Sequence, residues 1–267
     1  MENNRGESGS PIKSDQSFLF DPILSLSHPG FREAVSRWLE SNPPPDEHPK
    51  SEVFKKAMIQ AGYSRTIDPI NLDVYRSCSI RYANRNDILS GFGSQLRGGR
   101  FNAPRSFRVI YLSFDPATPY AETLKRAESL KAPALAGLPL KPSQELNKHF
   151  VQLTVRAVLN KIIDLSDLDL LNSKEFQDAG LDIELLTKDG WYFDNNEGKE
   201  SATQAIGRIA YELGYHGLIS RSSVSKGEKN LNVFVSNLPI GCGLEILEPK
   251  DLPSHWRKSS GDRSHES

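Results

Sequence analysis

The apolar and polar positions of this chain change period several times, and these changes predict which segments form helices and strands. Apolar residues at helical spacing predict helices over 30–41, 51–62, 119–130 and 201–213. Alternating or unbroken apolar runs predict strands over 72–76, 108–114, 150–159, 217–219, 231–235 and 244–247. The glycine-rich stretch 87–99 and the polar stretch 220–229 are expected to be loops.

The helix expected over 201–213 has the clearest terminal signals. Ser201 and Gln204 fit a capping box at its start, and Gly214 fits a C-cap after its end. The helix expected over 119–130 carries Glu122 in its first turn, where a carboxylate interacts favourably with the helix dipole.

Strands and helices mix without a regular alternation, which favours an α+β fold over a doubly wound one. The 267 residues suit one large domain with appendages. We expect a disordered polar N-terminus over 1–16, a helical extension over 17–70, the main domain over 71–250 and a polar tail over 251–267. Within the main domain, the proline-rich stretch 131–148 is expected to be a surface insertion.

Composition and charge narrow the class of protein. A formal net charge of −1 provides no general attraction for nucleic acid, so direct nucleic-acid binding is not expected. No apolar run approaches the ~20 residues of a membrane span. Cys78 and Cys242 are too few for a disulfide framework or a zinc cluster. We therefore expect a soluble cytoplasmic protein with no membrane partner.

The sequence lacks the motifs of several common kinds of catalytic site. The six histidines show no metal-ligand spacing, so no metal is expected. The chain has no Gly-x-Ser-x-Gly elbow, no Walker A loop and no Gly-x-Gly-x-x-Gly after a strand. These absences leave the polar residues at the edges of the predicted elements as candidates.

The segment Arg97–Pro104, with the sequence RGGRFNAP, is the most informative of these edges. It places Arg100 on a glycine turn, ahead of Tyr111 in a strand and Glu122 at a helix start. An arginine recognises phosphate through two fixed hydrogen bonds, so the three residues suit a phosphorylated nucleotide. The alternative is a hairpin turn with a surface arginine, a core tyrosine and a helix-start carboxylate.

These residues belong to a longer series of motifs that resembles the RES domain, a family named after an arginine, a glutamate and a serine. The series runs in order over roughly residues 72–247. It comprises Arg76, Arg81-Tyr82-Ala83, Ser90-Gly91, Gly98–Asn102, Ile110–Leu112, Ala121-Glu122, Thr203-Gln204, Gly214–Ile219, Ser222 and Asn230–Phe234. The three named residues match Arg100, Glu122 and Ser222. Ser222 is preferred to its neighbours Ser220 and Ser223 for its distance from Gly217.

The resemblance implies an ADP-ribosyltransferase-like fold of mixed and antiparallel sheets with flanking helices, here with an N-terminal helical extension. It also implies a toxin that consumes NAD and is neutralised by an Xre-type antitoxin. The sequence has no helix-turn-helix of its own, so the antitoxin would be a separate chain. The family includes NAD phosphorolysis with inorganic phosphate, NAD hydrolysis and ADP-ribosylation of a protein, and the sequence does not separate these activities.

The resemblance further implies roles for the residues. Glu122 would stabilise positive charge on the ribose while the nicotinamide–ribose bond breaks. Arg100, together with Arg81 or Arg76, would hold the pyrophosphate or an attacking phosphate. Ser222 would hydrogen-bond the nicotinamide ribose or the amide. Tyr82 and Tyr111 would stack on the nicotinamide ring. No metal or second cofactor would be needed, because nicotinamide is itself the leaving group.

The chain departs from the family pattern in three places. Phe101 stands where tryptophan is common, the insertion over 131–148 is long, and the N-terminal extension is additional. The rival hypothesis is a non-catalytic member that binds a nucleotide or a protein through the same groove. Retention of the Arg–Tyr–Glu–Ser set favours the enzyme.

Overall fold

A computed structural model describes residues 29–62, 66–67, 70–79, 88–122, 150–188 and 190–247. Its helices are α1 (Pro29–Ser41), α2 (Ser51–Gly62), α4 (Phe92–Arg97), α7 (Leu168–Leu171), α8 (Lys174–Ala179), α9 (Ile183–Thr187), α10 (Trp191–Asn196) and α11 (Ala202–Glu212). Its strands are β1 (Thr66–Ile67), β2 (Ile70–Ser79), β3 (Val109–Ser113), β4 (Phe150–Leu159), β5 (Ile162–Asp164), β6 (Gly217–Arg221), β7 (Lys229–Phe234) and β8 (Gly243–Leu247). None of the helices in the described ranges is long and apolar enough to cross a membrane.

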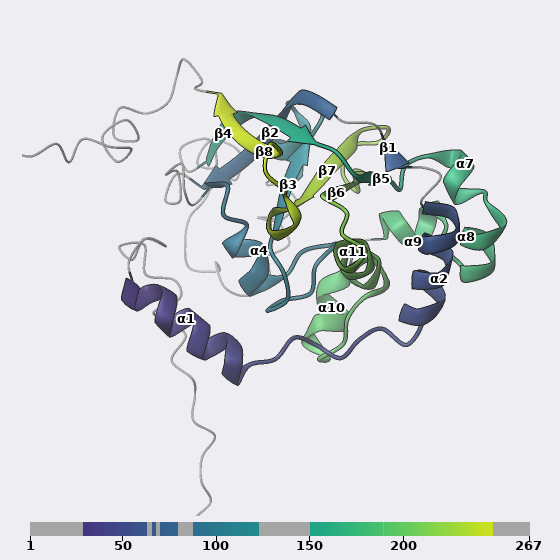
Figure 1. The fold of residues 1–267 in the computed structure, drawn as a ribbon, viewed down its shortest axis with the longest axis horizontal. Helices are drawn as coiled ribbons and strands as arrows, with labels where there is room; N and C mark the ends of the chain where they lie inside the picture. Colours follow the sequence, from purple (N-terminus) through teal and green to yellow (C-terminus); the bar gives the residue numbers. More distant parts are fainter. Residues whose placement is uncertain are drawn as a thin grey trace, which may run out of the picture.

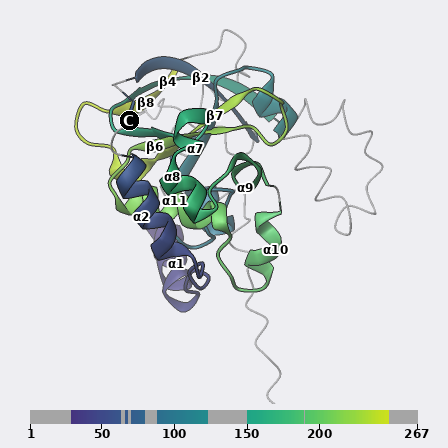
Figure 2. The same ribbon diagram turned by 90° about the vertical axis from the view of Figure 1, so that its right-hand side faces the viewer.

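The strands form one mixed sheet in the order β1-β5-β6-β7-β3-β2-β4-β8. Every neighbouring pair is antiparallel except β5 and β6, which are parallel and are joined by the crossover that holds α7 to α11. The strands lie above a layer of helices (Figures 1 and 2). This arrangement confirms the predicted α+β class, with mixed and antiparallel pairing and flanking helices.

Two apolar cores lie on opposite faces of the sheet. The first core lies between the sheet and the helices, and it includes Phe54 of α2, Phe176 of α8 and Ile209 of α11. The second core joins β4 and β8 to β6 and β7, although these strand pairs are not neighbours in the sheet. The intervening strands β2 and β3 also contribute to this core, so it runs along one face of the sheet.

The helix α11 confirms the terminal signals in the sequence. The Ser201 hydroxyl accepts from the Gln204 N–H and the Gln204 side chain accepts from the Ser201 N–H, which completes the capping box. Gly214 follows the helix with a φ of +74°, a value that favours glycine. Seven of the eleven residues of α11 are buried, so this helix is the central element of the first core.

The N-terminal helix α2 is joined to α11 by an arginine. The guanidinium of Arg208 donates to Glu200 Oε1 at 2.9 Å and to Ser51 Oγ at 2.8 Å. Glu200 Oε2 also accepts from the His48 N–H at 3.0 Å. Residues on both sides of the predicted boundary at residue 70 therefore share one ion-pair network, and the domain boundaries stay a prediction.

Two predicted loops contain regular structure. The stretch 87–99 contains α4, because Gly91 adopts a φ of +64° at its start and the Ser94 hydroxyl donates to the Gly91 carbonyl. The stretch 220–229 begins with the last two residues of β6, Ser220 and Arg221, and ends with the first residue of β7. The predicted insertion over 131–148 lies outside the described residues.

Candidate functional site

The turn that carries Arg100 depends on two adjacent glycines. Gly98 has a φ of +72°, where a side chain would be strained. A Cβ on Gly99 would lie 2.3 Å from the hydroxyl oxygen of Tyr111, so the tyrosine ring occupies the space of a side chain there. The Gly-Gly pair is therefore needed both for the turn and for the close approach of Tyr111.

The same turn is fixed by hydrogen bonds to its backbone and to one buried side chain. The Tyr111 hydroxyl accepts from the Phe101 N–H at 3.0 Å and donates to Asn102 Oδ1 at 2.7 Å. The Asn102 amide donates to the carbonyls of Ser94 and Phe107. Asn102 is fully buried, so these bonds replace water that the turn cannot reach.

Arg100 leaves this turn towards the end of β6. Its Nη1 donates to the Arg221 carbonyl oxygen at 2.9 Å, and its guanidinium carbon lies 5.0 Å from the centre of the Phe101 ring. An arginine held by its own turn and by a second strand can present a fixed guanidinium to an anion.

Glu122 lies in a helical turn that starts at residue 118. Asp115 Oδ2 accepts from the N–H groups of Ala117 and Thr118, which caps the start of this helix. Glu122 Oε1 accepts from Ser222 Oγ at 3.1 Å and from Asn230 Nδ2 at 2.6 Å. No described residue hydrogen-bonds Glu122 Oε2, which leaves that oxygen as an acceptor for another molecule.

Ser222 and Asn230 come from the two ends of the turn between β6 and β7. The Ser222 hydroxyl accepts from the N–H groups of Val224 and Ser225 while it donates to Glu122. Asn230 Oδ1 accepts from the Ser113 hydroxyl at 2.7 Å, which fixes the direction of its amide. Both Ser222 and Asn230 are buried, at 8% and 7% exposure, so Glu122 is oriented by donors with few alternative partners.

The structure thus brings three of the predicted residues into one group. Arg100 contacts the carbonyl of Arg221, the next residue is Ser222, and Ser222 donates to Glu122. Tyr111 joins the group as a support of the Arg100 turn, with its hydroxyl already engaged. Of the three nearby serines, Ser222 is the one that contacts Glu122. The catalytic and binding roles of these residues stay predictions.

Arg76 does not lie with this group. It pairs with Leu153 in β4, on the face of β2 that also carries Val74, and both neighbours belong to the second core. Its Nη1 donates to the Tyr111 carbonyl at 3.1 Å, and its buried Nε has no hydrogen-bond partner among the described residues. Burial lowers the pKa of Arg76 below its usual range and raises the pKa of the Cys78 thiol to about 11. Arg81 and Tyr82 lie outside the described residues.

Sequence reasoning missed Asn230 and Ser113 as parts of the site. Asn230 stands within the motif Asn230–Phe234, so its position was visible but its contact with Glu122 was not. Ser113 ends an apolar strand, and a polar residue facing β7 was the signal that could have identified it.

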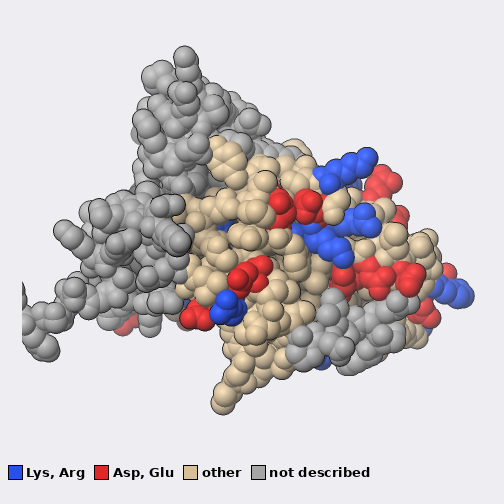
Figure 3. Space-filling view, turned by 90° about the horizontal axis from the view of Figure 1, so that it is seen from above, with Lys and Arg blue, Asp and Glu red and all other residues tan. Residues whose placement is uncertain are grey.

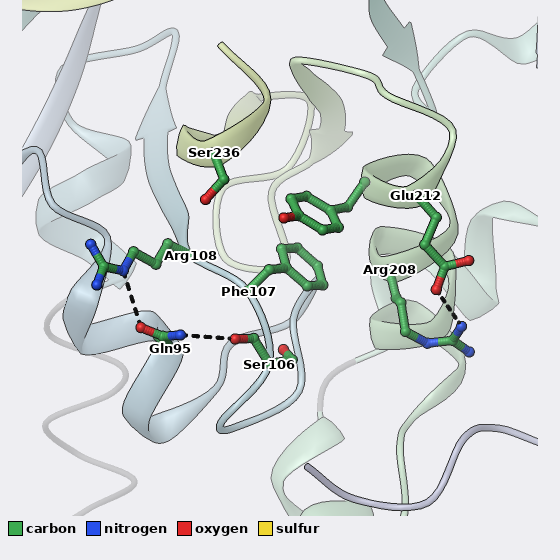
Figure 4. Close-up of a pocket in the computed structure, with 8 residues that line it drawn as sticks. Gln95, Ser106, Phe107, Arg108, Arg208, Glu212 and Ser236 are labelled. Carbon is green, nitrogen blue, oxygen red and sulfur yellow. Dashed lines mark hydrogen bonds and ion pairs between the residues drawn. The ribbon is translucent and has the colours of Figure 1, made fainter. Parts of the chain in front are cut away.

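A cavity elsewhere in the structure contains none of these residues. It lies between α11 and the start of β3, and its lining includes Gln95, Arg108, Arg208 and Glu212 (Figure 4). These side chains already pair with one another, because Arg108 donates to Gln95 and Arg208 donates to Glu212. We therefore assign the candidate site to the Arg100–Glu122 group, not to this cavity.

Charges and histidines add little to the site. On the face seen from above, Lys or Arg and Asp or Glu side chains are interspersed (Figure 3). Among the described residues, no cluster of three or more His, Cys, Asp or Glu could hold a metal ion. His216 Nδ1 accepts from the Asn160 N–H at 3.2 Å, and burial lowers the pKa of His216. His216 therefore has a structural role at the start of β6.

Comparison with known proteins concerns the fold and the family of this chain. A chain of the M. tuberculosis MbcT–MbcA toxin–antitoxin complex has a similar fold, with a TM-score of 0.53 at 19% sequence identity. The alignment covers 77% of this chain and 97% of that chain. A search of curated proteins found no match. The family model described as the RES domain matches residues 73–256, which is more than half of the chain and includes every predicted site residue. This protein therefore belongs to the RES domain family.

Proposed function

We propose that this protein is a toxin enzyme that cleaves the nicotinamide–ribose bond of NAD, by phosphorolysis or hydrolysis, and that a separate antitoxin neutralises it. The observation that carries the proposal is the convergence of Arg100, Glu122 and Ser222, with Oε2 of Glu122 left without a described partner. Membership of the RES domain family supports the same reading.

Glu122 is the proposed electrostatic catalyst. Breaking the nicotinamide–ribose bond leaves the ribose with oxocarbenium character, and a fixed carboxylate stabilises that positive charge. Asn230 and Ser222 both donate to Oε1, so they orient the carboxylate and leave Oε2 to accept from the ribose hydroxyls. Because the Ser222 hydroxyl gives its single proton to Glu122, its first role is to orient that carboxylate.

Arg100 is the proposed ligand of the pyrophosphate or of an attacking phosphate. A preorganised arginine loses little freedom when it binds, because its turn is fixed before NAD arrives. The burial of Arg76 in the second core favours Arg81 as the second cation of the phosphate site. Stacking on nicotinamide is assigned to Tyr82 and Tyr111, and Tyr111 is half-buried and also supports the Arg100 turn.

A partner protein is the second part of the proposal. The solved chain with a similar fold comes from a toxin–antitoxin complex, and uncontrolled loss of NAD would harm the cell that makes the enzyme. We propose an Xre-type antitoxin on a separate chain. Expression of the protein alone should arrest growth, and expression of the Glu122→Gln variant should not.

The direct test is incubation of the purified full chain with NAD, followed by identification of the products. Free nicotinamide is expected without added metal and in the presence of a chelator. ADP-ribose as the second product indicates hydrolysis, a phosphate-dependent ADP-ribose phosphate indicates phosphorolysis, and labelled protein indicates ADP-ribosylation. Intact NAD after long incubation with folded protein would support the non-catalytic alternative.

A further inference from the structure

The buried side chain of Gln204 also contacts the Arg100 turn. Its Nε2 donates to the Gly99 carbonyl at 2.9 Å and to the Asn102 carbonyl at 3.2 Å. These two carbonyls belong to the residues that flank Arg100 and Phe101. Gln204 therefore ties the two ends of the turn to the first turn of α11.

The Gln204 carboxamide is itself held in one orientation. Its Oε1 accepts from the Ser201 N–H at 3.1 Å and from Asn195 Nδ2 at 2.8 Å. Asn195 Oδ1 in turn accepts from Gln204 Nε2 at 2.8 Å, so the two amides pair reciprocally. Reversing the carboxamide would turn its oxygen towards two carbonyl oxygens, which is unfavourable. The backbone around Gln204 therefore selects a single orientation.

The packing of α11 leaves no room for another arrangement at this contact. A Cβ on Gly207 would lie 1.9 Å from the Phe101 carbonyl oxygen, so the turn rests directly on the helix backbone. Gln204 is fully buried, so water cannot replace the hydrogen bonds that it donates. A change at Gln204 must therefore move the turn or leave the Gly99 and Asn102 carbonyls with only the backbone hydrogen bonds between these two residues.

We propose that Gln204 is a positioning residue for Arg100: its carboxamide, oriented by the backbone N–H of Ser201 and by the Asn195 side chain, fixes the turn and so the direction of the guanidinium. The expected effect on NAD cleavage rests on the proposed function. The expected effect on the turn rests on geometry alone. Displacement of about 1 Å at a reacting group can cost on the order of 100-fold in rate.

The test compares Gln204→Met with Ser201→Ala. The methionine removes the donated hydrogen bonds at similar length, whereas Ser201→Ala removes the serine hydroxyl of the capping box and leaves the carbonyls of the turn bonded. Gln204→Met is expected to lower kcat/KM for NAD by about 10–100-fold. Ser201→Ala is expected to lower the melting temperature while kcat/KM stays near the wild-type value.

A double-mutant cycle with Arg100→Lys separates positioning from general destabilisation. If Gln204 acts through Arg100, Gln204→Met should lower kcat/KM by less than about threefold once Arg100 is already lysine. Full additivity of the two losses would overturn the proposal. Equal losses of kcat/KM in Gln204→Met and Ser201→Ala would also overturn it, because the effect would then come from helix stability.

Hydrogen exchange of the peptide over 98–104 gives a readout that does not depend on NAD. Exchange is expected to rise in Gln204→Met and not in Ser201→Ala. If the wild type does not cleave NAD but the exchange difference is seen, the proposed function fails and the positioning of the turn stands. If Gln204→Met does not fold, Asn195→Ala removes the outer support of the carboxamide together with one hydrogen bond to the Lys199 carbonyl, and wild-type exchange and kinetics in that variant would overturn the proposal.

Discussion

Arg100 and Glu122 belong to the same candidate site, but the structure fixes them in different ways. The turn of Arg100 is held through its backbone by α11, by Tyr111 and by two glycines whose neighbours fill the space of a side chain. Glu122 is held through its carboxylate by the side chains of Ser222 and Asn230. Changes near Arg100 should therefore affect folding and activity together, whereas changes at Glu122 should affect activity alone.

The largest expected effect is the loss of activity in Glu122→Gln. The amide keeps an oxygen acceptor for Ser222 and Asn230 but loses the charge, so the rate of NAD cleavage should fall on the order of 10²–10³. Thermal unfolding should be little changed, because the amide oxygen can still accept the two side-chain hydrogen bonds that hold Glu122. Glu245→Gln, at an exposed position on β8, is the matched control and should cleave NAD at the wild-type rate. Full activity in a folded Glu122→Gln variant would remove Glu122 from the mechanism.

The next largest effect is expected at the contact between α11 and the backbone of the Arg100 turn. Gly207→Ala places a methyl group against the Phe101 carbonyl, and such overpacking should lower the free energy of unfolding by about 1–3 kcal/mol. Gly93→Ala, in α4 with no atom within 4 Å of the new Cβ, is the control and should be neutral or stabilising. Denaturant unfolding measures both variants. A stable Gly207→Ala variant would show that α11 and the Arg100 turn can move apart. It would contradict the view that the backbone of this turn is held rigidly by α11.

A third prediction concerns the two arginines. Arg100→Lys should weaken NAD binding about tenfold, since lysine lacks the planar fork. Arg76→Lys should leave the affinity for NAD near wild type, because Arg76 faces the second core. Calorimetric titration of NAD in a Glu122→Gln background avoids turnover. If Arg100→Lys binds NAD with the same affinity as its parent, Arg100 is a turn residue and not a ligand of NAD.

The smallest expected effect is a pH dependence of the free energy of unfolding. It originates at histidines that do not belong to the candidate site. The folded protein keeps the pKa of His216 below the usual 6.5 through burial and the nearby Lys161, so the unfolded chain binds the proton more readily. Stability should therefore fall as the pH drops below 6.5. His48 is shifted in the same direction by burial and adds to the loss. In His216→Asn, which keeps an acceptor for Asn160, unfolding free energies between pH 5 and 6.5 should depend less on pH than in wild type. If the free energy of unfolding depends on pH as strongly in His216→Asn as in wild type, His216 is not a source of that dependence.

Local signals in the sequence predicted local structure well. The capping box of Ser201 and Gln204 fixed the start of α11, and the alternation over 150–159 gave β4 with its observed ends. The helix α4 was missed because its glycines suggest a loop, while the bonds of Ser94 that support it involve Gly91 and the distant Val109. A short helix stabilised by such contacts has no strong periodicity of its own.

The site was predictable as a set of residues but not as an arrangement. The motifs placed Arg100, Glu122 and Ser222 on a list of candidates, and the resemblance selected them. The contacts of Glu122 with Ser222 and Asn230 depend on sheet register, which no single segment determines. The position of Arg76 on the opposite face follows from its pairing with Leu153, which the alternation over 72–76 could not specify.

The bond from Arg100 to the Arg221 carbonyl also affects when the site can form. Arg100 is 121 residues from Arg221, and Glu122 is 100 residues from Ser222 and 108 from Asn230. Contacts of such long range form late, because the entropy of closing large loops is lost first. Ribosomes add about 5–20 residues per second, so the segment from Arg100 to Asn230 takes on the order of ten seconds to synthesise. A chain interrupted before β7 lacks Asn230 and cannot complete the support of Glu122. Incomplete products of translation should therefore be inactive, and activity should begin only when a nearly complete chain has folded.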